Sequence, residues 1–276
     1  MSKVILTLKR HISAPVHLDT LTPDRVCGRK VTELANEEVW EGNRRIKIKT
    51  LFNIEGNIAD KPDDIALEII GDLSRTRSIG YKMTAGTLNI RGTGGLYIGE
   101  SMSGGTIIVE GDAGSWLGSN MRGGTIEVSG KTGNFVGAAS RGTTKGMMGG
   151  IITLKGNAGN EVGAWMNSGT IRILGNSEMA PGIHMTGGTI HISGDCSGRA
   201  GAQMKGGKII ISGNMQAPLP SFSFEEIREQ TKIEKDSVRG PFYVFSGDNN
   251  EDGNGKLFIN VERNSQLKWY EKFLEG

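Results

Sequence analysis

"MSGGTIIVEG" (Met102–Gly111) and "MRGGTIEVSG" (Met121–Gly130) are two copies of one pattern, placed 19 residues apart. The pattern occurs seven times, and its leading glycines follow one another at spacings of 19, 19, 19, 26, 19 and 19 residues. Those glycines are Gly80, Gly99, Gly118, Gly137, Gly163, Gly182 and Gly201. A fixed period of this length is typical of chains in which one structural unit is repeated and stacked.

Each repeat contains one short run in which aliphatic residues alternate with residues of any kind, and a period of two indicates a β-strand. The aliphatic pairs expected to face inward are Leu88/Ile90, Ile107/Val109, Ile126/Val128, Ile152/Leu154, Ile171/Ile173, Ile190/Ile192 and Ile209/Ile211. One strand per repeat cannot form regular hairpins, but it can stack in parallel on its copy at about 4.7–4.9 Å. We therefore expect an all-β fold, a right-handed parallel β-helix with 19-residue coils.

Two further columns recur in every repeat. The methionines are Met83, Met102, Met121, Met147, Met166, Met185 and Met204, and the glycines that close the strands are Gly92, Gly111, Gly130, Gly156, Gly175, Gly194 and Gly213. Glycine permits the backbone to turn where φ is positive or chains approach closely. Methionine fills irregular space in narrow cores, so we interpret its column as packing rather than as a soft metal site.

The ends of the chain fall outside the repeat and are expected to cap it. The predicted organisation is an N-terminal β-rich cap over 1–50, a β-helix over 51–218, and a C-terminal strand and helix cap over 219–276. In the first cap, Thr22 and Pro23 predict the start of a short helix, and residues 44–56 alternate toward a first irregular coil. In the second, residues 223–236 resemble a capping helix or charged loop, 240–264 two strands around a loop, and 265–276 an amphipathic helix.

Composition excludes several classes of protein. The chain has 276 residues, 43 glycines and a net charge of +2, which does not favour binding to nucleic acid or an anionic membrane. Its two cysteines cannot form a disulfide framework. The apolar opening is too short for a signal segment or a membrane span. We expect a cytoplasmic protein that binds neither nucleic acid nor membrane.

No catalytic, cofactor-binding or metal-binding constellation emerges from the residues. His184 and His191 occupy outward positions and are expected at the surface, while Trp116 and Trp165 are expected to stand alone, without the aromatic groove of a sugar-binding protein. Glu110 and Glu127 on adjacent coils could form a carboxylate pair, although exposed charge pairing with Arg91 and Lys155 is the structural alternative.

A loop of the calcium-binding kind would need an acidic residue at the position of Ile259. We therefore interpret the run Asp248-x-Asn250-x-Asp252-Gly253 as a turn rather than as a calcium-binding loop.

One repeat carries seven extra residues within Ala138–Gly146. Insertions in stacked repeats map to loops on one face, often a binding face. Arg141 and Lys145 lie in the insertion and Arg122 lies one repeat earlier, so these three are candidate contacts to a partner or to the tail of a substrate. A tolerated surface bulge remains the alternative.

The glycine-rich repeat, the non-repeat N-terminal segment and the tail "GDNNEDGNGKLFINVERN" together resemble the C subunits of formylmethanofuran dehydrogenases over essentially the whole chain. The repeat region from Gly56 to Ala217 also resembles the C-terminal domain of glutamate synthase. The C subunit of bacterial formyltransferase/hydrolase complexes is similar and stays open as an alternative, as does a stand-alone glutamate-synthase-type domain. The remote alternative is a carbohydrate-active β-helix enzyme.

The resemblance implies a scaffold subunit, itself non-catalytic, of the complex that reduces CO₂ and forms formylmethanofuran in methanogenesis. It implies molybdenum- or tungsten-pterin, zinc and iron–sulfur clusters on other subunits and no cofactor on this chain. The implied partners are the catalytic A and B subunits, the D subunit and the iron–sulfur subunits.

Overall fold

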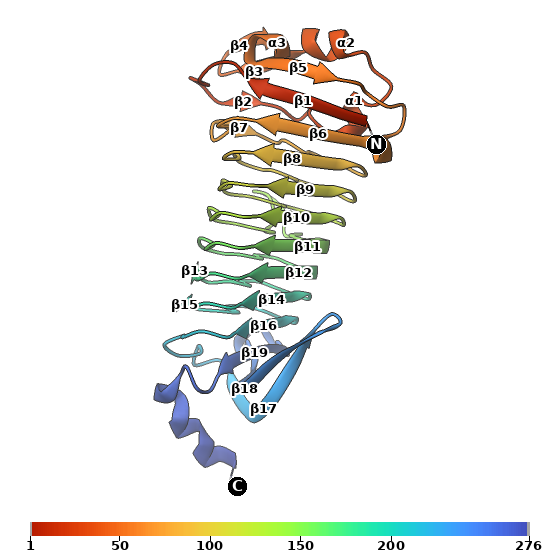
Figure 1. Cartoon of the computed structure of the whole chain (residues 1–276). Helices are drawn as coiled ribbons and strands as arrows, with labels where there is room; N and C mark the ends of the chain where they lie inside the picture. Colours follow the sequence, from red (N-terminus) through yellow and green to blue (C-terminus); the bar gives the residue numbers. More distant parts are fainter. Residues whose placement is uncertain (1, 275–276) are drawn as a thin grey trace.

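Most of the strands join in one elongated sheet. The computed structural model describes residues 2–274, and its largest sheet has 13 strands in the order β17-β18-β19-β16-β14-β12-β11-β10-β9-β8-β6-β1-β5. Figure 1 shows the repeat strands lying one above another between a compact N-terminal segment and a C-terminal hairpin. The all-β class expected from the sequence is confirmed, and the large sheet is mixed, with parallel and antiparallel pairs.

The repeat strands pair in parallel with matching residues in register. They are β8 (Thr87–Arg91), β9 (Thr106–Val109), β10 (Thr125–Val128), β11 (Met148–Leu154), β12 (Ser168–Ile173), β14 (Thr189–Ile192) and β16 (Lys208–Ile211). Ile107 pairs with Ile126, which pairs with Ile152 on the next strand. β6 (Ile65–Ile70) precedes these strands and pairs in parallel with β8. Short strands β13 (Ser177–Met179) and β15 (Cys196–Gly198) pair with each other on another side of the repeats.

The predicted inward residues form the core. All seven repeat methionines and all the predicted aliphatic pairs are fully buried. The methyl group of each methionine from Met83 to Met185 fills space beside a glycine of the next repeat, and that of Met204 lies beside Gly255 in the C-terminal segment. A Cβ atom added at Gly150, where φ is +89°, would lie 2.7 Å from Cε of Met121. The glycine and methionine columns are therefore sterically coupled.

Polar side chains at the turns form a second kind of ladder. Asp112 Oδ1 accepts a hydrogen bond from the backbone N–H of Lys131 at 2.9 Å, and Asn157 Oδ1 accepts one from Asn176 N–H at the same distance. Asn176 in turn accepts from Asp195 N–H at 2.8 Å. These side chains satisfy backbone donors of the following repeat, so the turn positions are structural.

The N-terminal segment reverses the sheet direction at one end. It contains β1 (Ser2–Leu8), β2 (Val16–His17), α1 (Pro23–Val26), α2 (Val31–Asn36), β3 (Glu38–Glu41), β4 (Arg44–Lys47), α3 (Ile48–Leu51), β5 (Phe52–Gly56), the 3₁₀-helix η1 (Pro62–Asp64) and β7 (Thr76–Arg77). β1 is parallel to β6 but antiparallel to β5, while β4-β3-β2-β7 form a separate sheet. Thr22 caps α1 as predicted, whereas α3 interrupts the alternating run expected over 44–56.

The C-terminal segment covers the other end. It contains β17 (Ser223–Ile233), β18 (Asp236–Gly247), the 3₁₀-helix η2 (Asn249–Glu251), β19 (Gly255–Asn260) and the 3₁₀-helix η3 (Ser265–Leu274). β19 continues the parallel stack on β16, and β18 lies antiparallel to it.

Two expectations for the C-terminal segment need correction. The prediction of a helix or charged loop at 223–236 is wrong, because pairing with β18 holds β17 extended despite its helix-favouring residues. The helix expected over 265–276 is a 3₁₀-helix in its described part, and its last two residues lie outside the described chain.

Candidate functional site: the insertion and its flanking cavities

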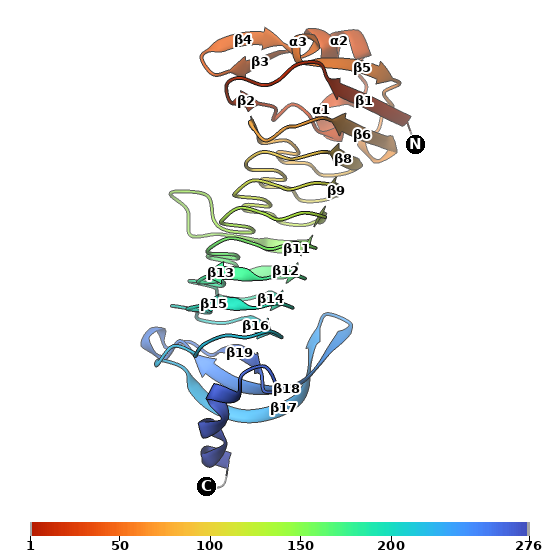
Figure 2. The same ribbon diagram turned by 60° about the vertical axis from the view of Figure 1, so that its left-hand side comes forward.

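The insertion leaves the stack between β10 and β11. Figure 2 shows it as a loop that projects from the side of the stacked repeats. Arg141 and Lys145 are exposed in it, and Arg122 is exposed beside the start of β10. Within residues 2–274 none of the three forms an ion pair. Their charges are therefore available to an external group.

The base of the insertion is tied to the preceding repeat by Asn120. Its Oδ1 accepts a hydrogen bond from Ser140 N–H at 3.0 Å, and its Nδ2 donates to the carbonyl oxygen of Lys145. Ser119 Oγ also donates to the carbonyl oxygen of Ala138 at 2.9 Å. These bonds fix where the insertion leaves the stack, which a freely tolerated bulge would not require.

The three candidate cations do not form one site. Arg141 lines a cavity of about 330 Å³ on the N-terminal side of the insertion, together with His17, Arg77, Ser78, Tyr97, Glu100 and Ser140. Lys145 lines a cavity of about 260 Å³ on the other side, with Thr144, Met148, Asn167 and Thr186. Arg122 lines neither of these cavities. The insertion thus separates two recesses.

A larger cavity adjoins each recess. On the N-terminal side, about 510 Å³ is lined by His17, Asp19, Trp40, Gly42, Ser78, Tyr81 and Glu100. On the other side, about 480 Å³ is lined by Thr144, Trp165, His184, Thr186, Gln203, Lys205 and Glu251. Cavities of this size suit small molecules or inserted side chains. Their walls come from the N-terminal segment, several repeats, the insertion and, at Glu251, the C-terminal segment.

Aromatic side chains form columns on the repeats beside the insertion. The rings of Tyr97 and Trp116 are 5.7 Å apart and nearly parallel, and those of Trp116 and Phe135 are 4.3 Å apart. Trp165 stacks on His184 at 3.9 Å. The expectation that Trp116 and Trp165 stand alone is wrong, because equal positions in successive repeats fall in one column. The 19-residue spacing of Tyr97, Trp116 and Phe135 carried that signal.

Glu100 is the titratable group most affected by this environment. Burial raises the pKa of its carboxyl above its ordinary value, against smaller lowering effects of the hydrogen bond from Ser140 and the charge of Lys82. Ser140 Oγ donates to Glu100 Oε1 at 3.3 Å, so the insertion reaches the repeat on which Glu100 lies. This half-buried carboxyl lines both N-terminal cavities.

The other residues singled out from the sequence have structural surroundings. His191 is half-buried rather than at the surface. Burial, followed by the charge of Arg172, lowers the pKa of His191 to about 4. The ion pair of Arg172 with Asp236, at 2.7 Å, brings the tip of the β17–β18 hairpin to this face.

The carboxylate and calcium-like motifs also have structural roles. Glu110 pairs with Arg91 at 3.4 Å, as in the charge-pairing alternative. Asp248 caps η2 through Asn250 N–H, which confirms the turn reading.

Within residues 2–274 no group of three or more His, Cys, Asp or Glu side chains is arranged to hold a metal ion. Within the same residues no helix has the length and apolar character needed to cross a bilayer.

Comparison with known proteins reveals similarity to one kind of subunit. No family model matches the sequence. The chain is 42% identical over 99 residues to the C subunit of tungsten-containing formylmethanofuran dehydrogenase 2 from Methanothermobacter wolfeii, covering 36% of this chain and 37% of that protein. It is 33% identical over 98 residues to the C subunit of molybdenum-containing formylmethanofuran dehydrogenase 1 from Methanosarcina barkeri, covering 36% and 33%. The matched region thus spans about a third of these curated relatives.

The fold likeness extends much further along the chain. A chain in the crystal structure of the formyltransferase/hydrolase complex of Methylorubrum extorquens with methylofuran superposes with a TM-score of 0.82 and 26% identity, covering 93% of this chain and 99% of that one. The expected resemblance is therefore confirmed: the chain is similar in sequence to the C subunits of formylmethanofuran dehydrogenases and, over nearly all its length, in fold to a chain of a formyltransferase/hydrolase complex.

Proposed function

We propose that this chain is the scaffolding C subunit of a formylmethanofuran dehydrogenase, the complex that reduces CO₂ and forms formylmethanofuran in methanogenesis. The observation that carries the proposal is the combination of sequence similarity to such C subunits with a fold match over 93% of the chain to a component of the FhcABCD complex. In this proposal the A, B and D subunits and iron–sulfur subunits are partners. Molybdenum or tungsten pterin, zinc and iron–sulfur clusters reside on those partners, and this chain works in the cytoplasm without catalytic residues.

The repeats supply a physical reason for a scaffold role. We infer that they close into a right-handed parallel β-helix over 51–218, capped by residues 1–50 and 219–276. The parallel register of the repeat strands and the buried methionine column support this geometry. Such a stack offers a long, rigid wall on which several subunits can be held in fixed positions.

The proposal is tested by purifying the chain, tagged at its N-terminus, from its native host under non-denaturing conditions. The expected result is co-purification in constant ratio with subunits that carry molybdenum or tungsten, zinc and iron, together with CO₂-dependent formation of the formylated furan. A chain that elutes alone, or that co-purifies with amidotransferase and flavin subunits, would contradict the proposal. The second outcome would favour the glutamate-synthase-type alternative.

A second function, as the C subunit of a formyltransferase/hydrolase complex, is favoured by the Methylorubrum match. The same purified complex distinguishes the two functions. A dehydrogenase complex reduces CO₂ with a low-potential electron donor, whereas a formyltransferase/hydrolase complex transfers and hydrolyses the formyl group without molybdenum or tungsten.

Within the proposed complex, the insertion Ala138–Gly146 contacts the formamide-forming subunit. Arg141 and Lys145 are exposed and unpaired within the described chain, and arginine forms strong, directional bonds with carboxylates. They meet either acidic residues of that subunit or the carboxylates of a substrate tail. Arg122 adds charge near the same wall.

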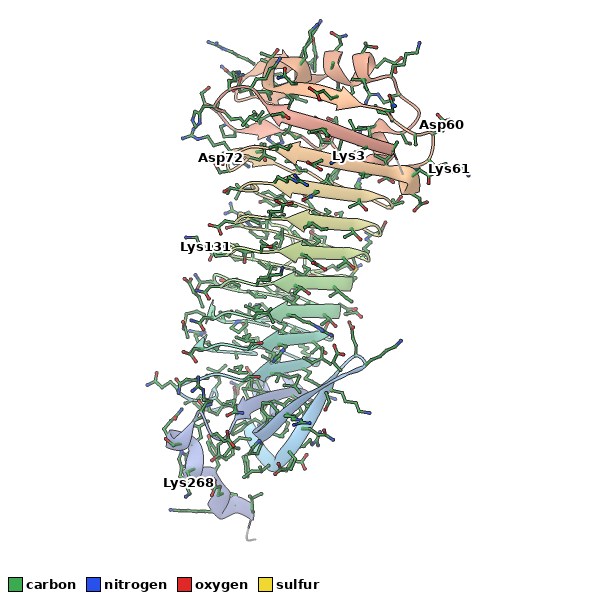
Figure 3. All side chains as sticks on the ribbon, viewed as in Figure 1. Lys3, Asp60, Lys61, Asp72, Lys131 and Lys268 are labelled. Atoms are coloured by element: carbon green, nitrogen blue, oxygen red, sulfur yellow. The ribbon has the colours of Figure 1, made fainter. Side chains whose placement is uncertain are left out.

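The test replaces Arg141 and Lys145 together by alanine in the whole complex. The control replaces Lys131 and Lys155, which are exposed elsewhere on the repeats, and Figure 3 shows Lys131 projecting from its turn. Weaker subunit association at rising salt, or a raised KM for the furan substrate, is expected only in the first variant. Equal assembly and kinetics in both variants would refute the contact.

A further inference from the structure

The larger cavity on the N-terminal side of the insertion is here called the Glu100 cavity. Its acidic and aromatic side chains have no part in the scaffold role proposed above. The cavity is an open recess of about 510 Å³, lined by His17, Asp19, Trp40, Gly42, Ser78, Tyr81 and Glu100. These residues come from β2 and β3 with the segments that follow them, and from two successive repeats. Because the two parts meet only in the folded chain, the cavity is a product of the way the N-terminal segment sits on the stack.

Two carboxylates of the cavity form no ion pair within the described part of the chain. Across the described residues 2–274, neither Asp19 nor Glu100 takes part in an ion pair, and Glu100 accepts a single side-chain hydrogen bond, from Ser140. Burial raises the pKa of Glu100 in spite of the lowering effects of the hydrogen bond from Ser140 and the charge of Lys82, which means that its ionised form is disfavoured as it stands. A cation in the cavity would offset that cost, because an opposite charge nearby favours the ionised form.

Two aromatic rings of the cavity are placed to attract cations. Trp40 is 47% exposed, so part of its ring is open to a ligand. The guanidinium carbon of Arg45 lies 4.9 Å from its ring centre, and Nζ of Lys82 lies 5.0 Å from the ring centre of Tyr81. Both distances are within the range of about 6 Å at which a cation is attracted to a ring face. The chain's own cations thus already use these two rings, while neither cation is part of the cavity lining.

The charge of the recess changes along its length. The adjoining cavity of about 330 Å³ shares His17, Ser78 and Glu100 with the Glu100 cavity, but it adds Arg77 and Arg141. Cationic ligands are therefore favoured at the end that holds Asp19 and Trp40 and disfavoured at the end that holds Arg141. This polarity gives a bound cation one preferred end.

We propose that the Glu100 cavity binds an organic ammonium group, held between the carboxylates of Asp19 and Glu100 and against the rings of Trp40 and Tyr81. The proposal rests only on the residues that form the cavity and does not depend on the proposed function. The ammonium group comes either from a free small molecule or from a lysine side chain of a partner subunit.

The chemistry is tested on the isolated full chain by calorimetric titration with choline. Its uncharged isostere dimethylbutanol serves as the ligand control. The expected result is saturable binding of choline and none of the isostere. Glu100→Gln and Asp19→Asn each weaken choline binding about tenfold, because each removes a charge and keeps the shape. Glu161→Gln, a carboxylate change on a later repeat outside the cavity lining, leaves binding unchanged.

If choline binds the parent chain, two results would still overturn the proposal. One is equal binding of choline and its uncharged isostere, since the site would then be merely apolar. The other is wild-type choline affinity in both Glu100→Gln and Asp19→Asn, with each variant melting like the parent chain. If the parent chain shows no saturable choline binding at all, the proposal also fails.

The source of the ammonium group is decided in the purified complex. A free ligand leaves the cavity open, so choline binds the complex as it binds the isolated chain. A partner lysine fills the cavity, so choline binding disappears in the complex and Glu100→Gln loosens the partner subunits at rising salt. If the chain assembles with no partner, the proposed function is contradicted. The choline result on the isolated chain is not affected by that outcome.

Discussion

Replacing Met121 by alanine tests whether the methionine column holds the stack together. Met121 is fully buried, and alanine removes its side chain beyond Cβ. The lost groups are worth about 2 kcal/mol, at about 0.8 kcal/mol for each buried CH₂-sized group. The space that remains adds about 1–2 kcal/mol, because a core of stacked backbone relaxes only in part. The free energy of unfolding should therefore fall by about 3–4 kcal/mol, which corresponds to a drop in Tm of roughly 10 °C.

The measurement is urea and thermal unfolding of the purified chain followed by circular dichroism. Arg122→Ala is the matched control, since Arg122 follows Met121 directly but is exposed. Its effect should stay within about 0.5 kcal/mol. If Met121→Ala also stays within that margin, the methionine column does not carry the packing, and the reasoning from burial is refuted.

The contact between Met121 and Gly150 provides a sharper form of the same test. Alanine at Gly150 would place Cβ 2.7 Å from Met121 Cε and 2.8 Å from the carbonyl oxygen of Gly124, at a φ of +89°. Met121→Ala removes the first clash and leaves the other two penalties. The double variant should thus lose less stability than the sum of the single variants, by more than about 0.5 kcal/mol. Strict additivity would show that the two columns are not coupled.

Three further outcomes are expected. Asn120→Ala should speed tryptic cleavage after Arg141 and Lys145 while leaving Tm nearly unchanged, because Asn120 is hydrogen-bonded to the insertion at Ser140 and Lys145. An unchanged cleavage rate would show that other contacts hold the insertion in place. The pKa of His191 is lowered from 6.5 to about 4, so the unfolded chain binds more protons between these values. The free energy of unfolding should accordingly rise with pH across that window, and His191→Gln should flatten the rise; identical pH profiles would contradict this. The isolated chain should show no formyl transfer or CO₂ reduction and no stoichiometric metal by elemental analysis, and tightly held zinc, iron or molybdenum would disprove this.

The repeat was readable from sequence because its signals are local and periodic. The alternation in Ile107–Val109 and its copies predicted strands, and the strands pair in parallel with matching residues in register. The methionine column was predicted as core for the same reason, since equal spacing places equal positions above one another. Thr22 and Pro23 marked the start of α1 through capping chemistry that depends on a few adjacent residues.

Features that depend on distant segments were predicted less well. Residues 223–233 are rich in Glu, Arg, Gln and Lys, which favour helix, yet they form β17 because β18 supplies hydrogen-bond partners along almost its whole length. His191 was expected at the surface, but it is half-buried next to Arg172, whose ion pair with Asp236 brings the β17–β18 hairpin to this face. In both cases a long-range contact overrides the local preference.

The sequence by itself determined the strands, the inward residues and the place of the insertion, because a constant spacing converts one-dimensional order into stacked columns. The sequence also contained the signal for the aromatic column, in the equal spacing of Tyr97, Trp116 and Phe135. Only the stacked structure showed that these three residues are neighbours. Tertiary structure alone decided that Arg141 and Lys145 line opposite sides of the insertion, and that Asp19 and Trp40 meet Glu100 in one cavity. These residues lie far apart in the chain or on a loop without a period, so their positions follow from how the N-terminal segment and the insertion pack against the repeats.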